Sequence, residues 1–156
     1  IKFIALYMKS AKQNATKKRT RKRHRLNDNY HNTIIHTFFE LLLTVKMFHW
    51  NTKLYSAHSS SDDYYSKLNT YMDKFIEVYL GRTGKLKVEL QSLHVPTVKS
   101  NVELISYLSK FKFFLLHVEK ELTLLRMPNS DLLTLLSIRD DILSETNQLI
   151  YLLNLK

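Results

Sequence analysis

Four residues near the middle of the sequence have the spacing of metal ligands on one helix. His58 and Asp62 are four residues apart, and so are Asp73 and Glu77. Residues four apart in a helix lie one turn apart on the same face, so each pair could share an ion. Asp73 follows Asp62 by eleven residues, which is three turns with about 20° left over. We therefore expect the four side chains to lie along one line of the helix.

The two pairs are too far apart to bind one metal ion within a single chain, because eleven residues of helix rise about 16 Å. Two copies of the helix packed antiparallel around a twofold axis would bring the first pair of one chain to the second pair of the other. His49, on the apolar stripe of the preceding predicted helix, could join His58 and Asp62. Two imidazoles with several carboxylates are suited to non-haem iron, and zinc or manganese would also be accepted.

A simpler interpretation of the same residues is a polar helix flank in contact with water. A histidine on an apolar stripe is often a core residue with one hydrogen bond, which would account for His49. Carboxylates four residues apart repel each other by roughly a few tenths of a kcal/mol on an exposed helix, so Asp73 and Glu77 would then be slightly unfavourable. The spacing alone leaves both interpretations open.

Four helices are predicted to position these residues, because apolar residues recur at steps of three and four over four long stretches. Only two Gly and two Pro occur, whereas β proteins need many turn residues. The helices are expected at about residues 29–54, 58–80, 101–126 and 131–154. With 44% hydrophobic residues, the chain can bury one core, and we expect an all-α fold with a single bundle.

Capping residues mark the expected ends of these helices. The polar residues 27–29 precede the first helix, and Gly81 is expected to end the second. Ser100 and Glu103 have the spacing of a capping box at the start of the third. Pro128 breaks the chain before the fourth.

The lengths of the connections favour a four-helix bundle with one long crossover. Only a few residues separate the first two helices and the last two, so each of these pairs is expected to be antiparallel. About 18 residues, Arg82 to Lys99, join the second helix to the third. They are enough to recross the bundle when mostly extended, at about 3.3 Å per residue. This is the ferritin-like arrangement, with a simple up-down-up-down bundle as the alternative.

The net charge of +10 is concentrated at the beginning of the chain. The first 25 residues hold ten of the 24 Lys and Arg residues and no acidic residue, so the remainder holds fourteen of each sign. We expect residues 1–27 to be a basic arm that is disordered when unbound, ahead of a bundle formed by residues 28–156. The candidate nucleic-acid-binding residues are Lys17, Lys18, Arg19, Arg21, Lys22, Arg23 and Arg25.

The part of the arm from Lys9 to Arg25 would bind DNA or another polyanion without reading bases, because it lacks aromatic residues and a rigid recognition element. Neutralising about seven phosphates would make the affinity fall with log salt at a slope of about −6. A capsid contact, an acidic protein surface or a nuclear-import signal could use the same charges.

Composition also excludes several classes of protein. The absence of Cys rules out disulfides and thiolate metal sites, and it suits a reducing intracellular compartment. No run of about 18 apolar residues occurs, so no membrane-spanning helix is expected. A basic run rather than a small-residue cleavage site follows the opening residues, so we expect no secretory signal.

The segment from Phe48 to Asn51, followed by His58, Asp62, Asp73 and Glu77, resembles the Dps family of small ferritin-like proteins that protect DNA in bacteria. The resemblance covers residues 30 to about 80. It implies that His49, with the other four, forms an inter-subunit ferroxidase site in a dodecameric shell that oxidises Fe(II), often with peroxide. It also implies a Lys-rich N-terminal arm on DNA.

The sequence departs from the Dps pattern in the connection between the first two helices. The interval from His49 to His58 is about three residues shorter than is usual in the family, and the Gly-Pro stretch of the family is missing. Trp50 would quench oxidising intermediates if the family role holds, although core packing is the more common role of such a residue. No Glu-x-x-His pair occurs in the third and fourth predicted helices, so the intra-bundle di-iron site of classical ferritins is not expected.

A second resemblance is to proteins of large DNA viruses of algae and protists, in which dense basic arms precede ferritin-like domains. It implies the alternative function, a non-catalytic structural or genome-packaging component such as a virion or minor capsid protein. Such a protein would use its arm to contact nucleic acid or protein. A plain helical interaction module with a nuclear-localisation tail is the third hypothesis.

Overall fold

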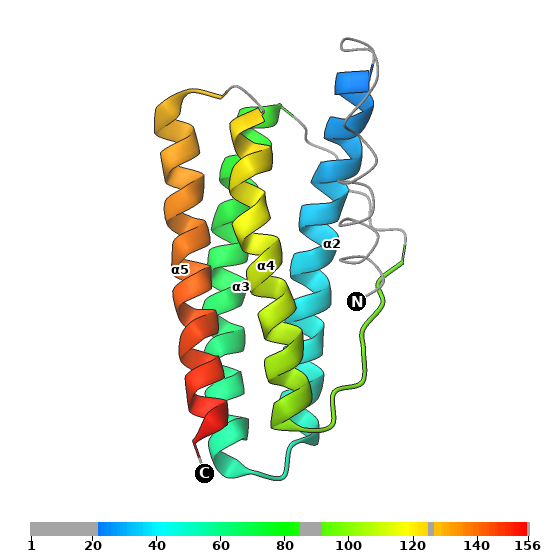
Figure 1. Ribbon diagram of the computed structural model, residues 1–156, viewed down its shortest axis with the longest axis vertical. Helices are drawn as coiled ribbons and strands as arrows, with labels where there is room; N and C mark the ends of the chain where they lie inside the picture. Colours follow the sequence, from blue (N-terminus) through cyan, green and yellow to red (C-terminus); the bar gives the residue numbers. More distant parts are fainter. Residues whose placement is uncertain (1–21, 85–91, 125–126, 156) are drawn as a thin grey trace.

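The computed structural model describes residues 22–84, 92–124 and 127–155, with the side chains of residues 32 onwards in the first range. Four long helices and no strand occur in these residues (Figure 1). They are α2 (Lys22–Asn51), α3 (Tyr55–Thr83), α4 (Asn101–Leu124) and α5 (Asn129–Asn154). The predicted all-α four-helix bundle is confirmed. No helix in the described ranges is both long and apolar enough to span a membrane.

Neighbouring helices run antiparallel, and the chain crosses the whole bundle between α3 and α4. Figure 1 shows α3 ending at one end of the bundle and α4 beginning at the other. The described part of this connection, residues 92–99, has no regular secondary structure and passes down the outside of the bundle beside α2. The backbone N–H of His94 donates to Glu40 Oε1 on α2 at 3.2 Å, which fixes the connection there.

Four phenylalanines from three helices meet in the core that aligns the helices. The Phe38 ring of α2 contacts Phe75 of α3 and Phe111 and Phe114 of α4 edge-on, with centroids 5.5, 5.9 and 6.4 Å apart. All four side chains are buried. Each large buried aromatic side chain contributes about 2–3 kcal/mol relative to an exposed one. This packing fixes how α2 lies against α3, and therefore positions the residues at their shared end.

Helix α2 begins earlier than predicted, at Lys22 rather than near residue 29. Residues 22–27 of the predicted basic arm therefore lie on a helix, and they include three of the predicted nucleic-acid-binding residues, Lys22, Arg23 and Arg25. The polar residues 27–29 do not stop the helix, because Lys, Arg and Leu extend a formed helix at little cost. The rest of the predicted arm lies outside the described residues.

The prediction that Gly81 ends the second helix is wrong, because α3 continues to Thr83. Gly84 adopts the left-handed conformation, with φ 68°, and its N–H bonds to the carbonyl of Leu80 at 3.0 Å. Gly81 lies inside the helix, where glycine costs about 1 kcal/mol relative to alanine but is tolerated. The helix also begins at Tyr55, three residues before the expected position.

The predicted capping interaction at the start of α4 is present. Ser100 Oγ accepts the backbone N–H of Glu103 at 3.3 Å, and Glu103 Oε2 accepts the backbone N–H of Lys99 at 2.8 Å. Two helix-terminal donors are satisfied in this way.

Candidate metal site

The end of α2 and the beginning of α3 bring His49 and His58 face to face. Only residues 52–54 separate the two helices, so the chain must reverse within a few residues. The imidazole rings stack with centroids 3.9 Å apart and an interplanar angle of 25°. The interval between the two histidines is short for the Dps family, but it does not keep their rings apart.

Each of these histidines is held by the backbone of the other. The Nδ1 atom of His49 lies 2.9 Å from the carbonyl oxygen of His58, and the Nδ1 atom of His58 lies 2.9 Å from the carbonyl oxygen of His49. A carbonyl oxygen only accepts, so each Nδ1 carries a proton and donates it. In the neutral ring, Nε2 then keeps its lone pair, which is the tautomer of a metal-binding histidine whose second nitrogen is oriented by a carbonyl.

Asp62, one turn along α3 from His58, faces the same cluster. Its Oδ1 atom lies 3.7 Å from His49 Nε2. Two donors that bind one ion at about 2.1 Å each are separated by about 3.0–3.4 Å, so this pair is only a few tenths of an ångström too wide. His49 is 8% exposed, whereas 51% of the Asp62 side chain is exposed. The cluster therefore opens to solvent at the carboxylate.

Lys46, which the sequence-based prediction missed, is also part of the cluster. Its Nζ donates to Asp62 Oδ1 at 3.0 Å and lies 4.5 Å from the centre of the Tyr65 ring. The hydrogen bond from Lys46 is the main reason why the pKa of Asp62 is lowered; burial opposes it, and electrostatic interactions with Lys46, His49 and His58 act in the same direction as the hydrogen bond. Lys46 precedes His49 by one helical turn, and this spacing was the only sequence signal of its position.

Asp73 and Glu77, the other two predicted ligands, do not join this cluster within one chain. Both are exposed on α3, and even the nearer one, Asp73, lies eleven residues or about 16 Å of helix beyond Asp62. Among the described residues, no group of three or more His, Cys, Asp or Glu side chains is arranged to hold a metal ion. A complete metal site therefore requires ligands from outside the chain.

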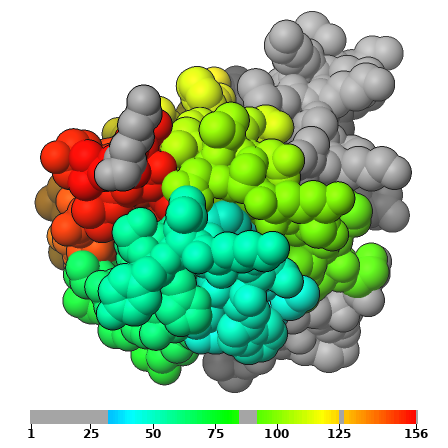
Figure 2. Space-filling view, turned by 90° about the horizontal axis from the view of Figure 1, so that it is seen from below, coloured from blue at the N-terminus to red at the C-terminus, as the bar shows by residue number. Residues whose placement is uncertain are grey.

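The surface around the cluster carries large apolar side chains. Trp50 is 65% exposed and Tyr55 is 84% exposed, so the expectation that Trp50 packs in the core is wrong. Trp50 is the penultimate residue of α2, and its ring lies 5.8 Å from Lys46 Nζ. Figure 2 views this end of the bundle, where the turn between α2 and α3 lies beside the start of α4 and the end of α5.

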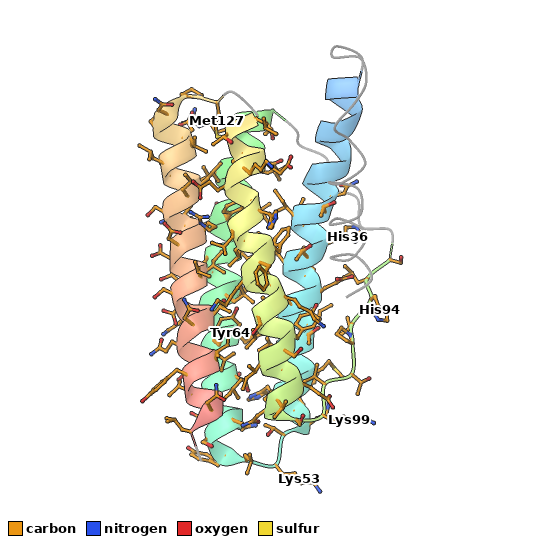
Figure 3. The ribbon with its side chains drawn as sticks, viewed as in Figure 1. His36, Lys53, Tyr64, His94, Lys99 and Met127 are labelled. Atoms are coloured by element: carbon orange, nitrogen blue, oxygen red, sulfur yellow. The ribbon has the colours of Figure 1, made fainter. Side chains whose placement is uncertain are left out.

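Several polar side chains away from this cluster are buried and bonded within the bundle. Tyr64 points into the bundle (Figure 3), and its hydroxyl bonds to Thr146 Oγ1 at 2.8 Å. Glu40, which the sequence-based prediction did not single out, is 1% exposed and anchors the connection at His94. Burial raises the pKa of Tyr107 to about 12; a hydrogen bond with Thr44 opposes the rise, and the charge of Glu40 adds to it.

The fold and this site define the chain as an all-α bundle with a paired-histidine cluster at one end. Residues 49–153 match a family of unknown function (DUF5856), and the chain belongs to this family. The matched range includes the candidate ligands from His49 to Glu77, but it excludes Lys46 and the basic residues at the beginning of the chain. No curated protein and no solved structure matched the chain.

Proposed function

We propose that the protein binds Fe(II) between two copies of the chain and oxidises it with oxygen or peroxide, as the Dps resemblance implies. The main support is the reciprocal bonding of His49 and His58, which leaves the lone pair of each Nε2 unused by these bonds, with His49 Nε2 3.7 Å from Asp62 Oδ1. The carboxylates must be ionised and the imidazoles neutral, so iron binding should weaken below about pH 6. Iron is the substrate, and zinc or manganese could bind to the same ligands.

An antiparallel pair of α3 helices would complete the site. The register that places His58 opposite Glu77 of the second copy also places Asp62 opposite Asp73, and the twofold axis then passes between Ser66 and Asn69. Both of these residues are exposed and short, so two helices could approach closely there.

Charge supports the same head-to-tail arrangement. One end of the α3 face carries His58 and Asp62, where Lys46 bonds to Asp62 and Lys53 lies in the connection that precedes the helix, and the other end carries the exposed carboxylates Asp73 and Glu77. A twofold axis would bring each positive end against a negative end. In Figure 3, Lys53 projects from the connection between α2 and α3 at this end of the bundle.

The test is the rate of Fe(II) oxidation, followed by absorbance, for the wild type and an Asp62→Ala, Asp73→Ala double variant. We expect the double variant to lose most of the activity, because each completed site loses two ligands. An Asp63→Ala, Asp141→Ala variant is the matched control, since it removes two exposed carboxylates that lie off the proposed line. Equal slow oxidation by all three proteins would rule out the enzymatic function.

The second candidate is a non-catalytic structural or genome-packaging component, such as a virion protein. The ion pair between Lys46 and Asp62 favours it, because this pair neutralises the carboxylate without a metal. A protein of this kind would keep the bundle and the basic arm but would oxidise iron no faster than the double variant. The same assay therefore separates the two functions.

We also propose that the basic residues 17–25 bind DNA without sequence preference, whether the protein oxidises iron or has a structural role. Support comes from the sequence, where the whole excess of positive charge lies at the beginning of the chain. Deleting residues 9–21 removes six cations and leaves α2 complete. The deletion should strongly weaken DNA retardation at low salt in a gel-shift assay, because four of the seven predicted contact residues are lost. Unchanged retardation would place the polyanion site on the bundle.

A further inference from the structure

Lys46 reaches the carboxylate that a metal ion would need. Its Nζ lies 3.0 Å from Asp62 Oδ1, and His49 Nε2 lies 3.7 Å from the same oxygen. An ion bound by His49 and Asp62 would have to take this oxygen from the ammonium group. Two cations cannot share it closely, because like charges repel strongly at such distances. The lysine and the metal are therefore alternatives.

The surroundings of Lys46 allow its ammonium group either to bind Asp62 or to move into solvent. The ring of Tyr65 lies 4.5 Å from Nζ and stabilises the ammonium beside Asp62. The ring of Trp50 lies 5.8 Å from Nζ and is largely exposed. A lysine has a compact charge on a flexible four-carbon chain, so it can move outwards along Trp50 without disturbing α2. Only 25% of the Lys46 side chain is exposed while it is bonded to Asp62.

We propose that Lys46 is a built-in competitor of the metal, which holds Asp62 while the site is empty and is displaced when a divalent cation binds. The step is a ligand exchange without redox chemistry. The hydrated cation loses water and gains Asp62 Oδ1 and His49 Nε2, while Lys46 keeps its proton and moves to solvent. In the metal-free protein, the ammonium group of Lys46 thus neutralises the charge of Asp62. A metal cation binds only if its interaction with Asp62 and His49 is more favourable than that of the ammonium group with Asp62.

Zn²⁺ alone is the probe, because it is redox-inert and accepts the same ligands. Isothermal titration of Zn²⁺ at pH 8 should show up to about fivefold tighter binding to Lys46→Met than to the wild type, since losing a competing, partly exposed ion pair changes affinity by up to about fivefold. Lys67→Met is the matched control. Lys67 also pairs with a carboxylate, Glu145, at 2.8 Å, but it lies away from the cluster. Its Zn²⁺ affinity should equal that of the wild type.

The possible outcomes separate this inference from the proposed function on which it rests. Equal Zn²⁺ affinity in the wild type and Lys46→Met, or weaker binding in Lys46→Met, would overturn the competition but leave the metal site standing. Absence of Zn²⁺ binding in both would overturn both proposals. Asp62→Ala in the Lys46→Met background should remove the gain. Lys46→Gln, checked by circular dichroism, replaces Lys46→Met if the latter does not fold.

Discussion

His49 and His58 close the turn between α2 and α3 by donating to each other's backbone carbonyl oxygens, both at 2.9 Å. The two hydrogen bonds are reciprocal, since each histidine is the donor in one and provides the carbonyl acceptor in the other. The two imidazole rings are stacked. This arrangement explains why a polar pair persists beside an apolar core. It also means that the two histidines have a structural role whether or not a metal binds.

Replacing His58 with alanine should therefore destabilise the protein even without metal. The variant loses the bond to the His49 carbonyl and the ring contact, for an expected cost of about 1 kcal/mol. Urea unfolding at pH 8 in the presence of a chelator measures it. A double-mutant cycle with His49→Ala should show coupling, because the rings are in contact.

The control for His58 is His117→Ala, since His117 is exposed and bonds to the carbonyl of Phe113 in its own helix. We expect this variant to lose less than about 0.5 kcal/mol. A His58→Ala cost no larger than that of His117→Ala would show that the reciprocal bonds contribute nothing.

Apolar spacing was enough to predict the four helices, because burying one face of each helix requires that spacing. The beginning of α2 could not be predicted, because the capping preference of residues 27–29 is small compared with the ease of extending a packed helix. The position of Lys46 could not be predicted either. Its contact with Asp62 depends on how α2 and α3 are aligned, and the sequence does not reveal that alignment.

The pairing of Asp73 and Glu77 with the histidines of a second chain stays a prediction. The periodicity placed Asp73 and Glu77 on the same line of α3 as Asp62, and both are exposed there. What they face depends on a second chain. Spacing within one helix indicates which residues share a face, but it carries no information about what packs against that face.

The ion pair between Lys46 and Asp62 should make stability depend on pH in the acid range. The hydrogen bond from Lys46 lowers the pKa of Asp62 below its ordinary value of 3.8. A carboxylate with a lowered folded-state pKa stabilises the fold above its unfolded-state pKa, and this contribution is lost as the pH falls through the folded-state value. Asp62→Asn should therefore melt below the wild type by a constant margin at pH 5–7, and the margin should shrink below pH 3.8.

Thermal melts of both proteins from pH 7 to pH 2.5 measure this margin. Asp63→Asn is the control, because Asp63 is adjacent in sequence but outside the Lys46 contact. A margin that is unchanged at the lowest pH, or one that is the same for both variants, would argue against the ion pair.

The two glycines at the end of α3 should respond in opposite ways to alanine. Gly81 is helical, and an added Cβ there meets nothing within 4 Å, so Gly81→Ala should stabilise the protein by about 0.5–1 kcal/mol. Gly84 has φ 68°, which costs a residue with a side chain about 1–2 kcal/mol, so Gly84→Ala should destabilise it. Urea unfolding of the two variants checks the assignment, and effects of the same sign would contradict it.

The proposed twofold axis can be tested by cross-linking, because the chain has no native cysteine. In the proposed register Ser66 lies opposite Asn69 of the second copy, close to the axis. A Ser66→Cys, Asn69→Cys variant should therefore form a covalent dimer under mild oxidation, since facing residues at a close helix contact come within the Cα separation that a disulfide needs, about 4.4–6.8 Å. Non-reducing electrophoresis and mass spectrometry measure the product.

The chain offers a closely matched control for this experiment on α5. Ser144 and Asn147 have the same residue types, the same spacing of three and the same exposure on a helix, but they do not lie on the α3 face. A Ser144→Cys, Asn147→Cys variant should stay mostly monomeric on non-reducing gels, because random encounters are slow compared with reaction inside a formed dimer. If the two variants cross-link to the same extent, α3 does not pair in this register, and Asp73 and Glu77 cannot reach the histidines of a second copy in the proposed way.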